Sequence, residues 1–193
     1  IRTAYRALGC AADGAPVAVA VRSSSTVEDL EDSSGAGLQE TTLWVRGEDD
    51  VVHHVVRCWA SLFAARSIDH RLARGLDVSD AAMAVVVQLM VLPTSAGVAL
   101  TIDPLTGDRS RIVIDSAFGL GESVVSGVVT PDHFVVDKHR HEIVRRTIST
   151  KECEIIVLAD RLGQRPLDPQ RANRPSLSDD NVLAVAQLAR LVE

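Results

Sequence analysis

The sequence predicts an α+β protein built mostly from antiparallel sheets. Three observations support this class. Short apolar runs rich in β-branched residues recur along the chain and are bounded by turn residues, as expected for strands. Two stretches, 48–63 and 178–191, instead repeat apolar residues at helical spacing. Strands and helices do not alternate regularly, so a doubly wound parallel sheet is not predicted.

The first half of the chain is expected to contain two strands and three helical segments. The acids Glu48, Asp49 and Asp50 open the long helix, where the helix dipole favours negative charge. Its predicted buried face comprises Val51, Val52, Val55, Val56, Trp59, Leu62 and Phe63. The elements are a helix over 1–9 ending at Gly9, a buried strand over 17–21, a loop over 23–38, a strand over 41–46, the helix from 48, and a second helical piece ending at Gly75.

The second half is expected to be richer in strands. The apolar run 81–100 contains Gln88 and Pro93, which favours a strand–turn–strand over a membrane span. Three prolines make 160–175 an irregular connection, and Ser178 is a plausible cap for the closing helix. The expected strands cover 84–91, 97–102, 111–117, 133–137 and 142–148.

Composition excludes several classes of protein. The chain has 193 residues and a net charge of −6, which argues against a general nucleic-acid binder, although local arginines can still hold a nucleotide. Cys10, Cys58 and Cys153 form no C-x-x-C pair, so a disulfide framework is not expected and a reducing compartment, the cytoplasm, is the simpler interpretation. None of the six histidines has the spacing of a metal site, and no secretory leader is recognised.

Arg22 is the strongest candidate for a binding residue. A buried strand brings it to the start of four hydroxyl residues, 23–26, and a loop containing Gly35 and Gly37 follows. A guanidinium fork matches phosphate oxygens, and a glycine loop lets backbone N–H groups approach a polyanion. The alternative is that Arg22 forms a local ion pair with Glu28, Asp29 or another nearby acid.

Two further segments could contribute to a site. Glu122, in the second glycine loop, could face a ligand, or it could cap the helical turn that follows. The segment Gln88–Val91 could be an ordinary core strand, or its amide and backbone could edge a base while Met90 packs against the ring. Neither standard phosphate motif is present, because no G-x-x-x-x-G-K-[ST] string occurs and Val124 stands where a dinucleotide fold has its third glycine.

Several strings together resemble the phosphoenolpyruvate synthase and pyruvate phosphate dikinase family. The resemblance begins with Val19-Ala-Val-Arg-Ser-Ser-Ser-Thr-Val-Glu-Asp-Leu30 and Gly35-Ala-Gly-Leu-Gln-Glu-Thr41, and it covers most of the chain. Several of these strings look most similar to those of the rifampin phosphotransferase branch of the family. The later strings are 58–63, 85–91, 95–98, 103–107, 119–125 and 129–132.

The resemblance implies an ATP-grasp fold, in which two α+β lobes hold ATP. The lobes would be 1–80 and 81–160, followed by a connection and closing helix over 161–193. Such proteins transfer the β-phosphate of ATP to a histidine on another domain, and an acceptor-binding domain then uses it for pyruvate or another acceptor such as rifampin. The implied catalytic residue is Arg22, and the implied nucleotide-binding residues are Arg22, Gly35, Gly37, Gln39, Thr41, Gln88, Leu89, Met90, Val91 and Glu122.

The chain departs from the family pattern at four positions. Gly35, Leu38, Trp44 and Leu100 stand where the family usually has Phe, Gln, Asn and Phe. The family's ATP-contacting lysine would lie before Ile1. Its Gln-x-Arg-Pro motif, with the Mg²⁺ ligands, would lie after Glu193. We therefore expect this chain alone to be inactive, and a non-catalytic nucleotide-binding regulatory or interaction module is the alternative.

Overall fold

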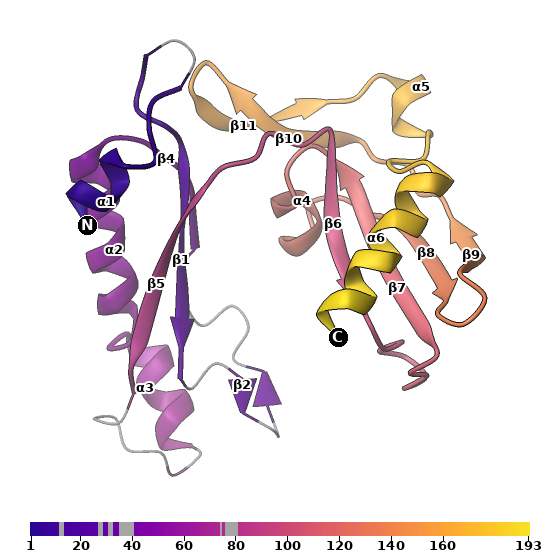
Figure 1. Cartoon of the computed structure of the whole chain (residues 1–193), viewed down its shortest axis with the longest axis horizontal. Coiled ribbons are helices and arrows are strands. Elements are labelled where there is room, and N and C mark those ends of the chain that lie inside the picture. The colour runs from indigo at the N-terminus through magenta and orange to yellow at the C-terminus, as the bar shows by residue number, and fades with distance from the viewer. Residues whose placement is uncertain (12–13, 27–28, 31–32, 35–40, 74, 76–80) are drawn as a thin grey trace. The chain divides into compact units, whose positions relative to one another are not determined.

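The computed structural model describes residues 1–11, 14–26, 29–30, 33–34, 41–73, 75 and 81–193 (Figure 1). Its contacts divide the chain into two units, Ile1–Val91 and Leu92–Glu193. The sequence predicted a division after residue 80. The boundary lies later because strand β5 (Met83–Leu89) pairs with strand β1 (Val19–Ser25) of the first unit.

The first unit contains a three-stranded antiparallel sheet in the order β4-β1-β5. Strand β4 (Thr41–Val45) pairs with one edge of β1, and β5 pairs with the other edge along its whole length. A two-residue ladder joins β2 (Asp29–Leu30) to β3 (Ser33–Ser34). The central strand β1 is therefore the element from which side chains can reach either neighbouring strand.

Helix α2 (Glu48–Ser61) buries one side of this sheet (Figure 1). Helix α1 (Arg2–Arg6) adds Tyr5, whose hydroxyl donates to the Val17 carbonyl at 2.6 Å and accepts from the Gly47 N–H at 3.0 Å. Helix α3 (Ala65–Leu72) follows α2. The buried core consists of Tyr5, Val19, Val21, Val45, Val51, Val55 and Cys58.

The predicted buried face of α2 is only partly correct. Val51, Val55, Cys58 and Leu62 are buried, and these positions lie on one stripe of a helix. The neighbouring stripe, which was also predicted to be buried, is exposed: Val56, Trp59 and Phe63 are 50%, 44% and 64% accessible. The apolar pattern was wider than the face that contacts the sheet.

The second unit contains a four-stranded antiparallel meander, β6-β7-β8-β9. Helix α6 (Asp179–Val192) packs on one face, and Ser178 caps it by accepting the Asn181 N–H at 3.3 Å, as predicted. Its core is formed by Ile112, Ile114, Phe134, Val136, Val182 and Ala186. The strands are β6 (Ser95–Leu100), β7 (Arg111–Phe118), β8 (Asp132–Asp137) and β9 (Glu142–Thr147).

The prediction of an irregular connection over 160–175 was wrong. Strands β10 (Cys153–Leu158) and β11 (Arg161–Pro166) form a hairpin, and helix α5 (Pro169–Ala172) follows it. The hairpin turns at Ala159 and Asp160, which both have positive φ. Such a turn usually carries Asn-Gly or Asp-Gly, so its sequence signal was absent here.

The segment 81–100 contains two strands, as predicted, but they do not pair with each other. β5 joins the sheet of the first unit and β6 joins that of the second. Among the helices that the structure describes, none combines the length and the apolar character that crossing a bilayer requires. The run is therefore two strands of different sheets.

Candidate functional site

The sheet of the first unit has two chemically different faces. Val19 and Val21 point into the core beneath α2, so Ala20, Arg22 and Ser24, which alternate with them, lie on the opposite face. Cross-strand partners share a face, and Arg22 pairs with Thr41 on β4 and with Val86 on β5. This second face, called here the Arg22 face, carries three of the predicted site residues: Arg22, Thr41 and Gln88.

Arg22 was predicted to lie at the end of its strand, and this was wrong. It lies within β1, and the strand continues through three serines to Ser25 because these residues pair with Ala84, Val85 and Met83 of β5. The side chain of Arg22 is exposed, and no side chain in the described part of the chain forms an ion pair or hydrogen bond with it. Its guanidinium is thus presented from the middle of a rigid sheet.

Only some of the predicted hydroxyls share the Arg22 face. Ser24 does, because it lies two residues along the strand, and Thr41 does, because it is the direct partner of Arg22. Ser23 and Ser25 lie on the side of the core. Thr26 bonds Ala82 instead: its Oγ1 accepts the Ala82 N–H at 3.1 Å. Arg22, Ser24 and Thr41 therefore form the polar group of this face.

The segment Gln88–Val91 lies at the end of β5. Gln88 pairs with Ala20 and so belongs to the Arg22 face, one row away from Arg22. Leu89 pairs with Val19, and the Met90 N–H donates to the Ala18 carbonyl at 2.9 Å. Because successive backbone groups of a strand point to opposite edges, the N–H and C=O groups of Leu89, the last residue of β5, point away from β1.

The remaining predicted residues cannot be placed beside Arg22. Gly35, Gly37 and Gln39 lie outside the described residues, as does Glu28, one of the acids considered as an alternative partner of Arg22. Glu122 belongs to the second unit. Of the ten predicted residues, the structure brings Arg22, Thr41, Gln88 and Leu89 onto one sheet, and Met90 and Val91 directly follow its strand β5.

Glu122 is the first residue of helix α4 (Glu122–Val125), and its side chain is exposed. Its backbone carbonyl accepts the Ser126 N–H at 2.9 Å, while the Ser123 hydroxyl donates to Leu120 O at 3.0 Å. The Glu122 carboxylate therefore caps neither Ser123 nor the helical turn that follows. Its position in the first turn of α4 is nevertheless one that the helix dipole favours for an acid.

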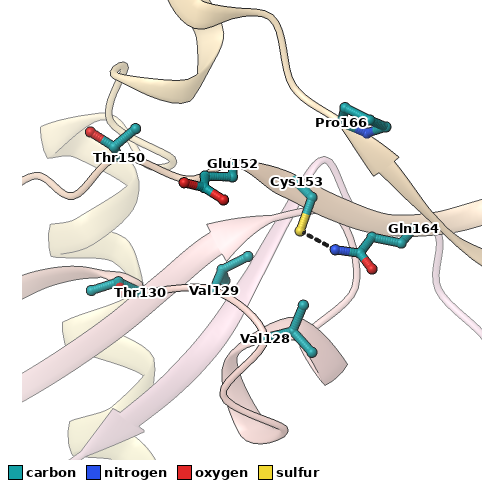
Figure 2. Close-up of a pocket in the computed structure, with 8 residues that line it drawn as sticks. All are labelled: Val128, Val129, Thr130, Thr150, Glu152, Cys153, Gln164 and Pro166. Atoms are coloured by element: carbon teal, nitrogen blue, oxygen red, sulfur yellow. Dashed lines mark hydrogen bonds between the residues drawn. The ribbon is translucent and has the colours of Figure 1, made fainter.

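A cavity of about 700 Å³ lies in the second unit, between the β10–β11 hairpin and the segment 128–130 (Figure 2). In its wall the Cys153 thiol lies next to the side chain of Gln164, whose Nε2 donates to the sulfur at 2.8 Å. The charged residue in its lining is Glu152, which would repel phosphate. None of the predicted site residues lines it, and we do not assign it to a polyanion.

The sequence did not single out the buried ionic groups of the second unit. Lys151 Nζ donates to Asp132 Oδ1 at 2.6 Å, and both side chains are fully buried. The same carboxylate accepts the N–H groups of Ser149 at 3.0 Å and Ser176 at 2.7 Å. A buried charge pair that also bonds backbone groups of separate segments fixes the positions of those segments in the fold, so we interpret it as structural.

The sequence also missed the conformation of Trp44. It has a φ of 61°, and the Arg46 guanidinium carbon lies 4.9 Å from the centre of its ring. The sequence does not indicate this backbone conformation, because tryptophan rarely adopts positive φ. In the described part of the chain, no group of three or more His, Cys, Asp or Glu side chains could hold a metal ion, so we assign no metal ligand.

Comparison with known proteins identifies a family. The model of the pyruvate phosphate dikinase AMP/ATP-binding domain matches residues 1–193. A rifampicin phosphotransferase of Streptomyces sviceus is 45% identical over 95% of the chain, and a probable phosphoenolpyruvate synthase of Archaeoglobus fulgidus is 44% identical over 98%. The phosphoenolpyruvate synthase of Pyrococcus furiosus is 40% identical over the whole chain.

These relatives are much longer than the chain. The aligned region makes up 21%, 25% and 24% of their respective lengths. The family model nevertheless covers the chain from its first residue to its last, and both phosphotransferase and synthase relatives agree with it. The chain therefore belongs to the pyruvate phosphate dikinase AMP/ATP-binding domain family.

Proposed function

We propose that the chain binds ATP with its phosphates on the Arg22 face of the β4-β1-β5 sheet. The observation that carries this proposal is the exposed guanidinium of Arg22, held mid-strand beside the Thr41 position and with no described acid paired to it. An arginine fork can donate two parallel hydrogen bonds to a phosphate, and a hydroxyl can add a third. The group is thus suited to a polyanion.

The base would lie at the outer edge of β5. Within the described sheets β5 is an edge strand, so the backbone groups that point away from β1 have no strand partner there. Leu89 and Val91 supply such groups two residues apart. Adenine carries an amino donor next to a ring-nitrogen acceptor, which one outward C=O and one outward N–H can match.

The wider activity is proposed for the longer protein to which such a domain contributes. We infer an ATP-grasp fold, supported by the family match and by the antiparallel sheet with packed helices that each unit contains. Transfer of the ATP β-phosphate to a histidine domain, and then to pyruvate, rifampin or another acceptor, fits the names of the relatives. Mg²⁺ would neutralise phosphate charge, with ligands contributed by other segments.

Calorimetric titration of the chain with Mg-ATP tests the binding proposal. Wild-type protein should bind, and Arg22→Ala should lose about tenfold to a hundredfold in affinity, since a charge-assisted bond contributes about 1.5–3 kcal/mol. Arg22→Lys should lie between them, because it keeps the charge without the bidentate fork. Arg57→Ala, an exposed arginine on α2 and so on the other side of the sheet, is the matched control.

Equal affinities of wild type and Arg22→Ala would remove the role given to Arg22. Absence of heat and of any thermal stabilisation by Mg-ATP at millimolar concentration would contradict nucleotide binding by the chain as a whole. Melting temperatures of all four proteins without ligand should be similar, because exposed substitutions away from the core usually change stability little.

A further inference from the structure

Strand β4 contains a bulge opposite Ala20 of β1. On one side of Ala20, Val19 pairs with Val45. On the other side, Val21 pairs with Thr42. Between these two pairs β4 has two residues where β1 has one, which is a β-bulge. Side chains of a strand alternate between the two faces, so the extra residue reverses the alternation along the rest of β4.

The bulge decides which threonine of β4 lies beside Arg22. Val45 is buried and pairs with a core residue, so it fixes one end of the ladder. Without a bulge, pairing would continue from Val45 one residue at a time and would place Thr42 opposite Arg22. With the bulge, Arg22 pairs with Thr41, while Thr42 lies on the side of the core.

The bulge is maintained against the local preferences of the sequence. A regular strand would place the apolar Leu43 opposite Val21 on the core side, where the bulge places Thr42. Trp44 would then have extended backbone, whereas in the bulge it has a φ of 61°, which is unusual for a bulky residue. Such backbone outliers persist where the surrounding structure maintains them, and they are concentrated at functional sites.

The end of the ladder at Val45 is held in place by Tyr5. The Tyr5 hydroxyl donates to the Val17 carbonyl at 2.6 Å and accepts the Gly47 N–H at 3.0 Å. It thereby joins the two chain segments just outside the last pair of the ladder, and both Tyr5 and Val45 belong to the buried core. This end cannot shift by one residue without losing these contacts, so the extra residue has to be accommodated within β4.

We propose that the β4 bulge is a positioning device: the positive φ of Trp44 holds the register in which Arg22 is paired with Thr41 and not with the next threonine. This inference rests on the proposed binding of ATP phosphates on the Arg22 face and adds the backbone feature that assembles that face. It depends on the main chain at position 44 and not on the contacts of the indole.

Calorimetric titration of two threonine variants with Mg-ATP tests the register. Thr41→Val should weaken binding about tenfold or more, because it removes a hydrogen bond to a charged phosphate. Thr42→Val is the matched control and should bind like wild type, since this side chain lies on the side of the core. The inference is overturned if Thr42→Val loses affinity instead, if both lose it equally, or if neither does while Arg22→Ala still does.

Substitutions at position 44 separate the register from the indole. Trp44→Val and Trp44→Asn both remove the ring, but asparagine tolerates positive φ and a β-branched residue does not. In the Trp44→Asn background the loss should stay with Thr41→Val. In the Trp44→Val background β4 should become regular, and the loss should move to Thr42→Val. A loss that stays with Thr41→Val in both backgrounds would overturn the inference. If Trp44→Val does not fold, the threonine comparison in the native chain decides.

A measurement without ligand separates this inference from the proposed function. Nuclear Overhauser contacts from the Arg22 backbone across to β4 should reach Thr41 in the native chain and in Trp44→Asn, and Thr42 in Trp44→Val. If these contacts are found but no protein binds Mg-ATP, the proposed function fails while the assignment of the register stands. Contacts from Arg22 to Thr42 in the native chain would overturn the inference whether or not ATP binds.

Discussion

At the residue scale, Arg22 shows that a candidate binding residue can be chosen from the sequence, whereas its neighbours in the fold cannot. An arginine after a buried apolar run and before hydroxyls pointed to phosphate. Its partners, however, depend on the register that places Thr41 and Val86 beside it, and these residues are distant in sequence. Long-range register follows from the packing of a whole sheet, so it was not readable from the motif.

Position 119 requires a glycine for two reasons, its backbone angle and a close backbone contact. It has a φ of 77°, and an added Cβ would lie 2.4 Å from the Ile155 carbonyl oxygen. That same oxygen accepts the Leu120 N–H at 2.8 Å, so it cannot move without breaking a bond. The glycine therefore allows the loop before α4 to approach β10 closely.

We predict that Gly119→Ala destabilises the second unit more than its backbone angle alone requires. The positive φ should cost about 1–2 kcal/mol, and displacement of the Ile155 backbone should add to it. Gly107→Ala is the matched control, because Gly107 has a φ of 72° with nothing within 4 Å of an added Cβ. Urea midpoints measure both. Equal shifts for the two variants would show that the close contact is not significant.

At the element scale, helices were predicted more accurately than turns. Helix α2 begins at the acids Glu48–Asp50 and α6 begins after its Ser178 cap, as local signals indicated. The β10–β11 hairpin was missed because Ala159–Asp160 carries no glycine or asparagine signal. The buried face of α2 was predicted too wide, because the sequence shows which residues are apolar but not how much of the helix the sheet covers.

The turn between β8 and β9 has a pH-dependent anchor. The pKa of Asp137 is held below the ordinary range because its Oδ1 accepts the Arg140 N–H at 3.0 Å and the His139 N–H at 2.9 Å. Arg111 Nη1 also donates to its other carboxylate oxygen at 2.6 Å. A lowered folded-state pKa stabilises the protein above the unfolded pKa, and this stabilisation is lost as pH falls through the folded pKa.

We therefore expect Asp137→Asn to lower the urea midpoint at neutral pH. The two proteins should converge as pH falls below about 4, where the Asp137 carboxylate becomes protonated and, like the amide, uncharged. Glu142→Gln, an exposed change on the neighbouring strand β9, is the control and should show no such convergence. A difference between wild type and Asp137→Asn that stays constant across this pH range would exclude the carboxylate charge as its source.

At the scale of the whole molecule, the family and the α+β class followed from sequence, whereas the assignment of β5 did not. The sequence placed this strand in the second lobe, but its full-length pairing with β1 joins the 88–91 segment to the sheet that carries Arg22. The proposed base and phosphate contacts thereby fall on one rigid element. This arrangement is what makes the first unit alone informative about nucleotide binding.

The most direct test of nucleotide binding on the Arg22 face is an NMR titration of the isotopically labelled chain with Mg-ATP, followed at each backbone amide. Binding on this face should give the largest shifts in β1 around Arg22, at the start of β4, and at Leu89 and Val91. The amide shifts of the exposed α2 residues Val56 and Trp59, and of the cavity lined by Glu152 and Gln164, should change little. Largest shifts at that cavity or along α2, with β1 unchanged, would contradict nucleotide binding on the Arg22 face.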